Sequence, residues 1–243
     1  MKIVLLGYGR MGRLIEKMAR EAGDEVIAAI HTVNAEKIGA REYEEAEVLI
    51  DFSLPDAAMQ FIPRFLKAGV PVVSGTTGWK DGELDYLKKL AAAEHTALLY
   101  APNFSVGVNV FFALNEYLAQ IMQNVEGYDV RLEETHHIHK KDAPSGTARA
   151  LAEQILEYNE KKMRWVNSRT SRPEELEIIS KREDEVPGTH VISYQSDHDR
   201  ITLRHEAFSR EGFARGALLA ARWIAGKEGI FTMNDVLGIK KKP

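Results

Sequence analysis

Residues 2–12 read KIVLLGYGRMG, and this short stretch decides the fold class. A buried-strand pattern runs directly into a glycine-rich turn, and a helical pattern begins at Arg10. This is the context of a dinucleotide-binding fingerprint. Gly7 permits the tight turn, Gly9 has no side chain to hold a pyrophosphate away, and Gly12 lets helix and strand pack closely. The helix N-terminus would favour the phosphates. A tight turn with no ligand is the alternative interpretation.

Strand and helix patterns alternate through about the first hundred residues. Short apolar runs predict buried strands, and apolar residues three and four positions apart predict helices between them. The predicted strands are Ile3–Leu6, Val26–Ile30, Val48–Phe52, Val70–Ser74 and Ala97–Tyr100, and the predicted helices are Arg10–Ala22, Ala57–Ala68 and Gly82–Ala93. Such alternation is typical of a parallel sheet covered on both faces. We therefore expect an α/β protein with a Rossmann-like dinucleotide-binding domain over residues 1–104.

The pattern changes after Asn103, where a second domain is expected over residues 105–210. An amphipathic helix comes first, marked by Val108, Phe111, Phe112, Leu118 and Met122. Alternating patterns then predict the strands Tyr128–Thr135, Leu176–Ser180, Thr189–Gln195 and Ile201–Ala207, with a polar loop over about 161–172. These elements indicate a smaller α+β domain with a mostly open sheet. A last amphipathic helix, Glu211–Ala225, is expected to bring residues 211–243 back to complete the first domain.

The composition excludes several classes of protein. The 243 residues carry 32 Lys plus Arg against 36 Asp plus Glu, a net charge of -4, which is too balanced for nucleic-acid binding by phosphate neutralisation. With no cysteine, disulfides, thiolate metal sites and cysteine nucleophiles are excluded. No apolar run suits a signal peptide or reaches the roughly 18 residues of a membrane span. We expect a cytoplasmic protein with no membrane or nucleic-acid partner.

The end of the second predicted strand bears on the choice of cofactor. An acidic residue there would bind the ribose hydroxyls of NAD, but this chain has His31, Thr32 and Asn34. Without a carboxylate to repel a 2′-phosphate, NADPH is admissible, so we predict dual use or a preference for NADPH. The counter-charge would come from Arg10, Arg13 or Lys37.

Two later turns also follow predicted strands, Gly75-Thr76-Thr77-Gly78 and Ala101-Pro102-Asn103-Phe104. Ligands of open parallel sheets bind at the carboxyl ends of the strands, so these turns are expected to line the nicotinamide half of the site. Ordinary turn chemistry is the alternative for each of them.

The densest chemistry lies in residues 133–148, EETHHIHKKDAPSGTA, between a strand pattern and a helical pattern. Histidine titrates near neutral pH, and lysine supplies a cation or an acid, so the segment suggests catalysis on an anionic substrate. Small residues at the predicted helix start, Ser145, Gly146 and Thr147, could bind a carboxylate. A metal site is one alternative, but the ammonium groups of Lys140 and Lys141 oppose a cation, and we expect none. A solvated charged loop is the other.

These motifs resemble the 4-hydroxy-tetrahydrodipicolinate reductase family, also called dihydrodipicolinate reductase. The match is collinear over essentially the whole chain, and its most specific block runs from Glu134 to Ala148. The supporting motifs are Gly7 to Gly12, Asp51-Phe52-Ser53, Gly75 to Gly78 and Asn103 to Asn109. Two positions depart from the family pattern: His31-Thr32 stand where many members have an acid, often followed by Arg, and Ile138 stands where Arg is frequent.

The resemblance implies a mixed-sheet second domain, a homotetramer, and reduction of a small cyclic dicarboxylate by NADH or NADPH in the diaminopimelate route of lysine biosynthesis. It also implies His136 as general acid/base, Lys140 as proton donor, His137 as a substrate contact, and Gly146 with Thr147 as carboxylate binders. The implied cofactor-binding residues are Gly7, Tyr8, Gly9, Arg10, Met11, Gly12, His31, Thr32, Gly75, Thr76, Thr77, Ala101, Pro102, Asn103 and Phe104. The alternatives are another two-domain amino- or imino-acid dehydrogenase and a non-enzymatic NADH-sensing module.

Overall fold

The computed structural model describes residues 1–31 and 39–240, apart from the side chains of residues 40–42. Thr32, Asn34 and Lys37, which the cofactor predictions include, therefore lie outside the described residues. The chain divides into two compact units. Unit 1 comprises residues 1–109 and 211–243, and unit 2 comprises residues 110–210. Each unit is described by itself below.

Unit 1 is built on a six-stranded sheet in the order β11-β5-β4-β3-β1-β2. All of its neighbouring strands run parallel. The strands are β1 (Lys2–Leu6), β2 (Glu25–Ile30), β3 (Val48–Asp51), β4 (Val72–Ser74), β5 (Ala97–Tyr100) and β11 (Gly229–Phe231). The expected parallel sheet is confirmed.

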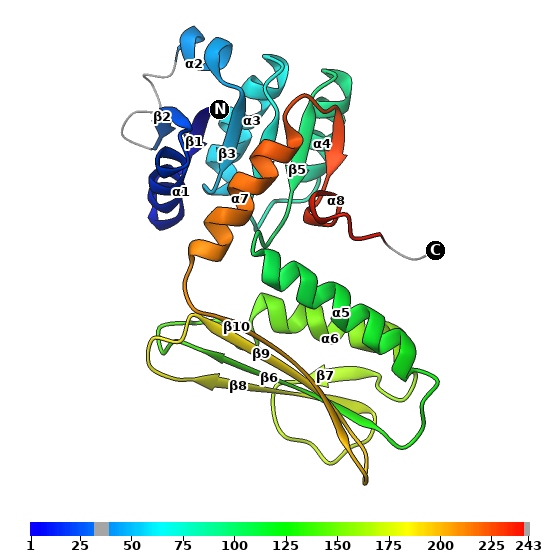
Figure 1. Cartoon of the computed structure of the whole chain (residues 1–243). Coiled ribbons are helices and arrows are strands. Elements are labelled where there is room, and N and C mark those ends of the chain that lie inside the picture. Colours follow the sequence, from blue (N-terminus) through cyan, green and yellow to red (C-terminus); the bar gives the residue numbers. More distant parts are fainter. Residues whose placement is uncertain (32–38, 241–243) are drawn as a thin grey trace. The chain divides into compact units, whose positions relative to one another are not determined.

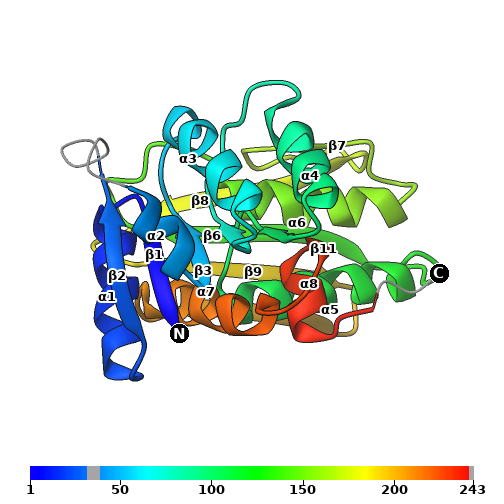
Figure 2. The same ribbon diagram turned by 90° about the horizontal axis from the view of Figure 1, so that it is seen from above.

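Helices cover both faces of this sheet (Figures 1 and 2), because successive strand residues point to opposite sides. Ile3 and Leu5 of β1 pack toward α1 (Arg10–Glu21) and α7 (Glu211–Ile224). Val4 and Leu6 pack toward α3 (Pro55–Lys67) and α4 (Glu83–Ala93). Two buried faces explain why the strands are apolar throughout instead of alternating.

Unit 2 contains a five-stranded mixed sheet in the order β10-β9-β6-β8-β7. Strand β6 runs parallel to β8 and antiparallel to β9. The strands are β6 (Asp129–His136), β7 (Arg164–Val166), β8 (Glu175–Arg182), β9 (Gly188–Gln195) and β10 (Arg200–Ala207). Apolar residues of α5 (Val106–Met122) and α6 (Gly146–Tyr158) share one core with β6, β8 and β9. The predicted second sheet is confirmed as mixed.

Four short elements were not predicted. Strand β7 lies inside the expected polar loop, while α2 (Ala40–Glu45), β11 and α8 (Met233–Leu237) follow stretches without a clear pattern. Strands β7 and β11 have three residues each, too few to show a periodicity. Among the described helices, none is long and apolar enough to cross a membrane.

Candidate active site

The glycine-rich turn between β1 and α1 is shaped by close backbone packing. Gly7 has a positive φ of 89°, and a Cβ added there would lie 2.4 Å from the carbonyl oxygen of Phe52. A Cβ on Gly12 would lie 2.1 Å from the carbonyl oxygen of Gly7. A Cβ on Gly9 would meet nothing within 4 Å. Gly7 and Gly12 are thus required by the protein itself, whereas Gly9 leaves open space at the helix N-terminus.

A cavity of about 530 Å³ adjoins this turn. It is lined by Leu6, Gly7, Tyr8, Gly9, Ile30, His31, Phe52, Ser53, Leu54, Ala57, Gln60 and Phe61. The Tyr8 ring stacks on His31 with a centroid distance of 6.3 Å, and the Arg13 guanidinium lies 5.6 Å from the Tyr8 centroid. Among the described residues that line it, none has a carboxylate. An acidic residue in such a position would repel the 2′-phosphate of NADPH.

The loops after β3 and β4 are joined by a buried aspartate. Oδ1 of Asp51 accepts hydrogen bonds from the Ser53 N–H at 3.0 Å and the Ser53 hydroxyl at 2.6 Å, and Oδ2 accepts one from the Ser74 hydroxyl at 2.6 Å. Burial raises the pKa of Asp51, against the opposing effect of these donors and of Thr76. Asp51 therefore fixes the loop that begins with Gly75.

Aromatic packing continues this arrangement to the loop after β5. A Cβ on Gly75 would lie 2.5 Å from the Phe52 ring, whose centroid is 5.5 Å from that of Phe104. Asn103 Oδ1 accepts a hydrogen bond from the Ser105 N–H at 2.9 Å. The structure thus brings the predicted residues of both turns, 75–77 and 101–104, to the same strand ends of unit 1 as the glycine-rich turn.

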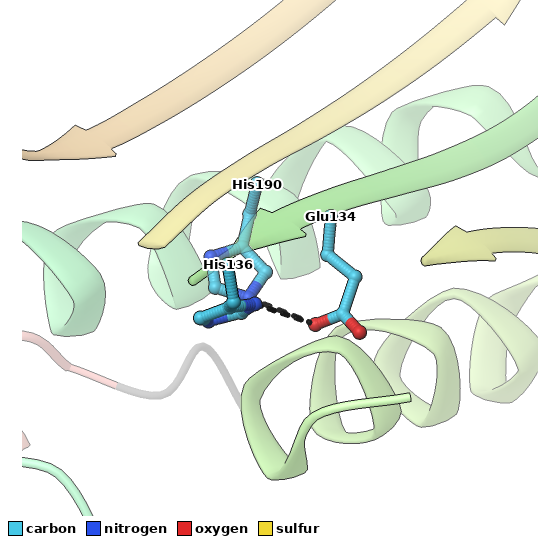
Figure 3. Close-up of side chains that lie close together, drawn as sticks. All are labelled: Glu134, His136 and His190. Carbon is cyan, nitrogen blue, oxygen red and sulfur yellow. Dashed lines mark ion pairs between the residues drawn. The ribbon is translucent and has the colours of Figure 1, made fainter. Parts of the chain in front are cut away.

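Strand β6 carries the polar cluster of unit 2 on its buried face. Val130 and Leu132 begin this face in the apolar core, and Glu134 and His136 continue it at the end of the strand. The Glu134 side chain is fully buried and that of His136 is 9% exposed. His136 Nδ1 lies 3.2 Å from Glu134 Oε2, and His190 of β9 stands opposite Glu134 in the sheet (Figure 3). His190 Nε2 is 3.8 Å from the same oxygen.

The second carboxylate oxygen of Glu134 accepts three hydrogen bonds. Oε1 accepts hydrogen bonds from the Ser145 N–H at 3.0 Å, the Ser180 hydroxyl at 2.7 Å and Arg182 Nη2 at 3.3 Å. Burial acts to raise the pKa of Glu134, but His136, Ser145 and Ser180 outweigh it and hold the pKa well below its usual range. The site therefore contains a permanent buried negative charge.

Ser145 connects this cluster to helix α6. Its hydroxyl caps the helix by accepting from the Ala148 N–H at 3.1 Å, and it lies 3.2 Å from His190 Nε2. Burial, reinforced by His136, lowers the pKa of His190 to about 3, so this imidazole is neutral at physiological pH. Gly146 and Thr147 begin the helix. As first-turn residues, they have N–H groups with no acceptor inside the helix.

The loop between β6 and α6 carries the remaining predicted residues. His137 is half-buried, and burial, reinforced by Arg210, lowers its pKa. Lys140 Nζ pairs with Asp142 Oδ1 at 2.8 Å. Arg182 donates to the carbonyl oxygens of Lys140 at 3.4 Å and Asp142 at 2.6 Å. The loop is therefore tied to the same arginine that contacts Glu134.

Sequence reasoning missed the supporting residues of this cluster, namely Glu134, Ser180, Arg182 and His190. One signal was available, because strict alternation along 130–136 places Glu134 on the apolar face with Leu132 and His136. A charge in such a position needs buried partners. The identity of those partners depends on strand pairing, which the sequence did not reveal.

The fold, the loops at the strand ends of unit 1 and the polar cluster of unit 2 define an NAD(P)H-dependent oxidoreductase, in which unit 1 is the dinucleotide-binding domain. Residues 1–104 match the family model for the N-terminus of dihydrodipicolinate reductase, and residues 107–237 match the model for its C-terminus. The chain therefore belongs to the dihydrodipicolinate reductase family.

Named relatives cover almost the whole chain. The 4-hydroxy-tetrahydrodipicolinate reductase of Christiangramia forsetii is 47% identical, with 98% of each chain covered. The enzyme of the same name from Archaeoglobus fulgidus is 39% identical, covering 98% of this chain and 100% of its own. The solved structure of dipicolinate-bound dihydrodipicolinate reductase from Paenisporosarcina sp. TG-14 shares the fold, with a TM-score of 0.79, 21% identity and 99% of each chain covered.

Proposed function

We propose that this chain reduces 4-hydroxy-tetrahydrodipicolinate to tetrahydrodipicolinate with NADH or NADPH, in the diaminopimelate route of lysine biosynthesis. The observation that carries the proposal is the group on unit 2: an imidazole beside a buried carboxylate, followed by a lysine and a helix N-terminus on one loop. The names of the relatives support the same reaction. Their agreement over both units favours it over an amino- or imino-acid dehydrogenase and over an NADH sensor.

The loops of unit 1 fit a dinucleotide. The open space at Gly9, the N-terminus of α1 and the neighbouring cavity would take the pyrophosphate and the adenosine half. We assign this binding to residues 7–12 and His31, and to Thr32 beyond the described residues; residues 75–77 and 101–104 would hold the nicotinamide half. When bound, the reduced nicotinamide supplies a hydride.

The residues of unit 2 fit a small cyclic dicarboxylate. One substrate carboxylate would accept hydrogen bonds from the N–H groups of Gly146 and Thr147, where the helix dipole favours negative charge. His137 would contact the substrate from the adjoining loop. Lys140 would add a positive charge if the substrate carboxylate took the place of Asp142, with which its ammonium now pairs at 2.8 Å. The dipicolinate bound to the Paenisporosarcina enzyme belongs to the same chemical class.

The conversion removes the 4-hydroxyl of the substrate as water and adds a hydride from the cofactor and one proton, so the reaction needs a proton source. We assign Lys140 as the proton donor and His136 as the general acid/base. Glu134 and the neutral His190 surround His136, and burial excludes water from most of the imidazole. The proton that His136 exchanges can therefore be held by only a few groups of the site, because little water reaches the imidazole.

A coupled assay with both cofactors tests the proposal. The purified chain should oxidise NADH or NADPH only when 4-hydroxy-tetrahydrodipicolinate is present. A sensor would bind the cofactor without turnover, and an amino-acid dehydrogenase would act on amino acids instead. Michaelis constants from the same assay test the predicted dual use or NADPH preference, which a large preference for NADH would contradict.

We also propose a cytoplasmic homotetramer. Within unit 2, α5 and α6 pack on one face of the sheet, and partly exposed residues such as Glu133, Ile179 and Lys181 line a hollow on the other. A face of this kind can bind another copy of the chain. Light scattering should give four times the chain mass of 27.3 kDa, and cell fractionation tests the location.

A further inference from the structure

We propose that Glu134 is the positioning residue of the site: its carboxylate orients the imidazole of His136 and, together with Arg182, fixes the turn that leads into α6. The inference rests on the proposed function, because that function makes His136 the general acid/base. It adds a residue whose side chain is fully buried. Glu134 acts through the groups that it holds.

The first contact of Glu134 selects one form of the His136 ring. Oε2 of Glu134 lies 3.2 Å from Nδ1 of His136, although the two atoms do not meet hydrogen-bond geometry. A carboxylate this close favours a proton on Nδ1 over one on Nε2, which leaves Nε2 free to exchange protons. Space at Nε2 comes from Gly188, where an added Cβ would lie 3.0 Å from this nitrogen. The carboxylate and the glycine thus act on opposite sides of the same ring.

The second contact fixes the segment assigned to the substrate. Oε1 of Glu134 accepts from the Ser145 N–H, one residue before α6, and from Arg182 Nη2. Arg182 in turn donates to the carbonyl oxygens of Lys140 and Asp142. One carboxylate therefore sets the ring of the acid/base, the start of the helix and, through an arginine, the loop that carries Lys140.

Few groups near Glu134 Oε2 can supply the positive charge that pairs with it. His190 faces Oε2 at 3.8 Å but is neutral, because burial lowers its pKa to about 3. Protonated His136 is therefore the cation that lies close enough to pair with Oε2. A carboxylate that stabilises the imidazolium in this way is a known device of acid/base catalysis.

A bound metal is the competing interpretation. Glu134, His136 and His190 offer ligand atoms that lie within 4.8 Å of one another. His190 Nε2, however, is already 3.2 Å from the Ser145 hydroxyl. Chelation separates the two interpretations. Activity that persists after dialysis against a chelator supports the positioning role, and activity that is lost and then restored by Zn²⁺ would overturn it.

Glu134→Gln is the principal test, since it keeps the size of the side chain and removes the charge. Glu157→Gln is the matched control, because Glu157 is exposed on α6 and lies outside the polar cluster. We expect Glu134→Gln to lower kcat by about tenfold to a hundredfold, less than the roughly 10⁴-fold effect of removing a hydrogen-bonded carboxylate from a catalytic histidine, because the Glu134–His136 contact lacks regular hydrogen-bond geometry. The KM for substrate should rise about tenfold through the loss of a charge-assisted hydrogen bond. Cofactor affinity and the control variant should stay unchanged.

A double-mutant cycle distinguishes positioning from a general structural role. In a His136→Gln background, Glu134→Gln should lower kcat by several-fold less than in the wild type, because the ring it orients is gone and only its effect through Arg182 on the Lys140 loop remains. The KM effect should persist, because Ser145 and Arg182 are still released. A full kcat effect in that background would overturn the proposal. An inactive wild type would instead contradict the proposed function.

Two measurements serve if Glu134→Gln unfolds. Arg182→Gln should raise the KM for substrate and also lower kcat, because it releases the loop that carries Lys140. An unchanged KM would contradict the second part of the proposal. The ¹⁵N shifts of the His136 ring should show a proton on Nδ1 in the neutral wild-type enzyme. A ring protonated on Nε2 would contradict the first part.

Discussion

The dinucleotide loops of unit 1 and the polar cluster of unit 2 are built in different ways. In unit 1 the decisive positions are glycines, and the site depends on where a Cβ is absent. In unit 2 the decisive positions are charged or titratable side chains, buried against one another at the end of β6. The first construction tolerates little added volume, whereas the second tolerates little change in charge. Substitutions of matched size should therefore affect the two regions differently.

The largest effect is expected in unit 2. His136→Gln should lower kcat by about 10² to 10⁴, the range of a lost general acid/base, and leave cofactor affinity nearly unchanged. Lys140→Ala should be at least as harmful, because it removes both a proton donor and a charge. Steady-state kinetics and cofactor titration provide the measurements. His139→Gln is the control, since that side chain is 71% exposed. Full turnover by His136→Gln would remove His136 from the mechanism.

The glycine turn of unit 1 offers a comparison between two alanine substitutions. Gly12→Ala should lower both stability and cofactor affinity, because its Cβ would lie 2.1 Å from a backbone oxygen; overpacking of this kind costs about 1–3 kcal/mol. Gly9→Ala should weaken cofactor binding alone, because its Cβ meets no protein atom within 4 Å. Thermal melts and cofactor titration separate the two. Equal loss of stability in both variants would show that Gly9 is also a packing position.

The smallest expected effect concerns the stability of unit 2 toward acid. Burial lowers the pKa of His190 to about 3 in the folded chain, against about 6.5 when unfolded. The unfolded state therefore binds the proton first, and the stability present above about pH 6.5 declines as the pH falls toward 3. Between pH 7.5 and 5.5 the loss should be about 1 kcal/mol.

Urea unfolding at these two pH values measures the difference. A His190→Gln variant should show the smaller decline, because glutamine does not titrate. An identical decline in both proteins would mean that the buried imidazole does not contribute to it.

Local patterns were sufficient to predict the parallel sheet and the dinucleotide turn. The Gly7–Gly12 spacing and the apolar runs of β1, β3 and β5 are local patterns, which depend only on residues a few positions apart. They can therefore be recognised from the sequence alone. Strand β11 differs, because it is defined by pairing Gly229 with Ala97, far earlier in the chain. Its sequence, Gly229–Phe231, contains no apolar run like the one that predicted β4, so β11 had no local signal of its own.

The polar cluster was only half predictable for the same reason. His136 and Lys140 belong to one dense segment, and their chemistry is evident from residue type. The role of Glu134 depends on β6 lying between β8 and β9, which brings Ser180 and His190 to its two sides. Arg182 depends on the same pairing. A site whose side chains come from several strands can be predicted only when the pairing and register of those strands are known. Residue spacing does not provide them.

Helix α7 has a consequence for synthesis of the protein on the ribosome. Its residues 214–224 fill the core against β1, β3 and β5, and Gly216 packs so closely that a Cβ would lie 1.7 Å from the Phe104 carbonyl oxygen. The first 109 residues therefore emerge with part of one side of their sheet uncovered, because only α1 covers that side before α7 is made. Unit 2 is a single uninterrupted segment and can complete its own core first. The nascent chain must keep its earliest strands from aggregating until nearly the last helix has left the exit tunnel.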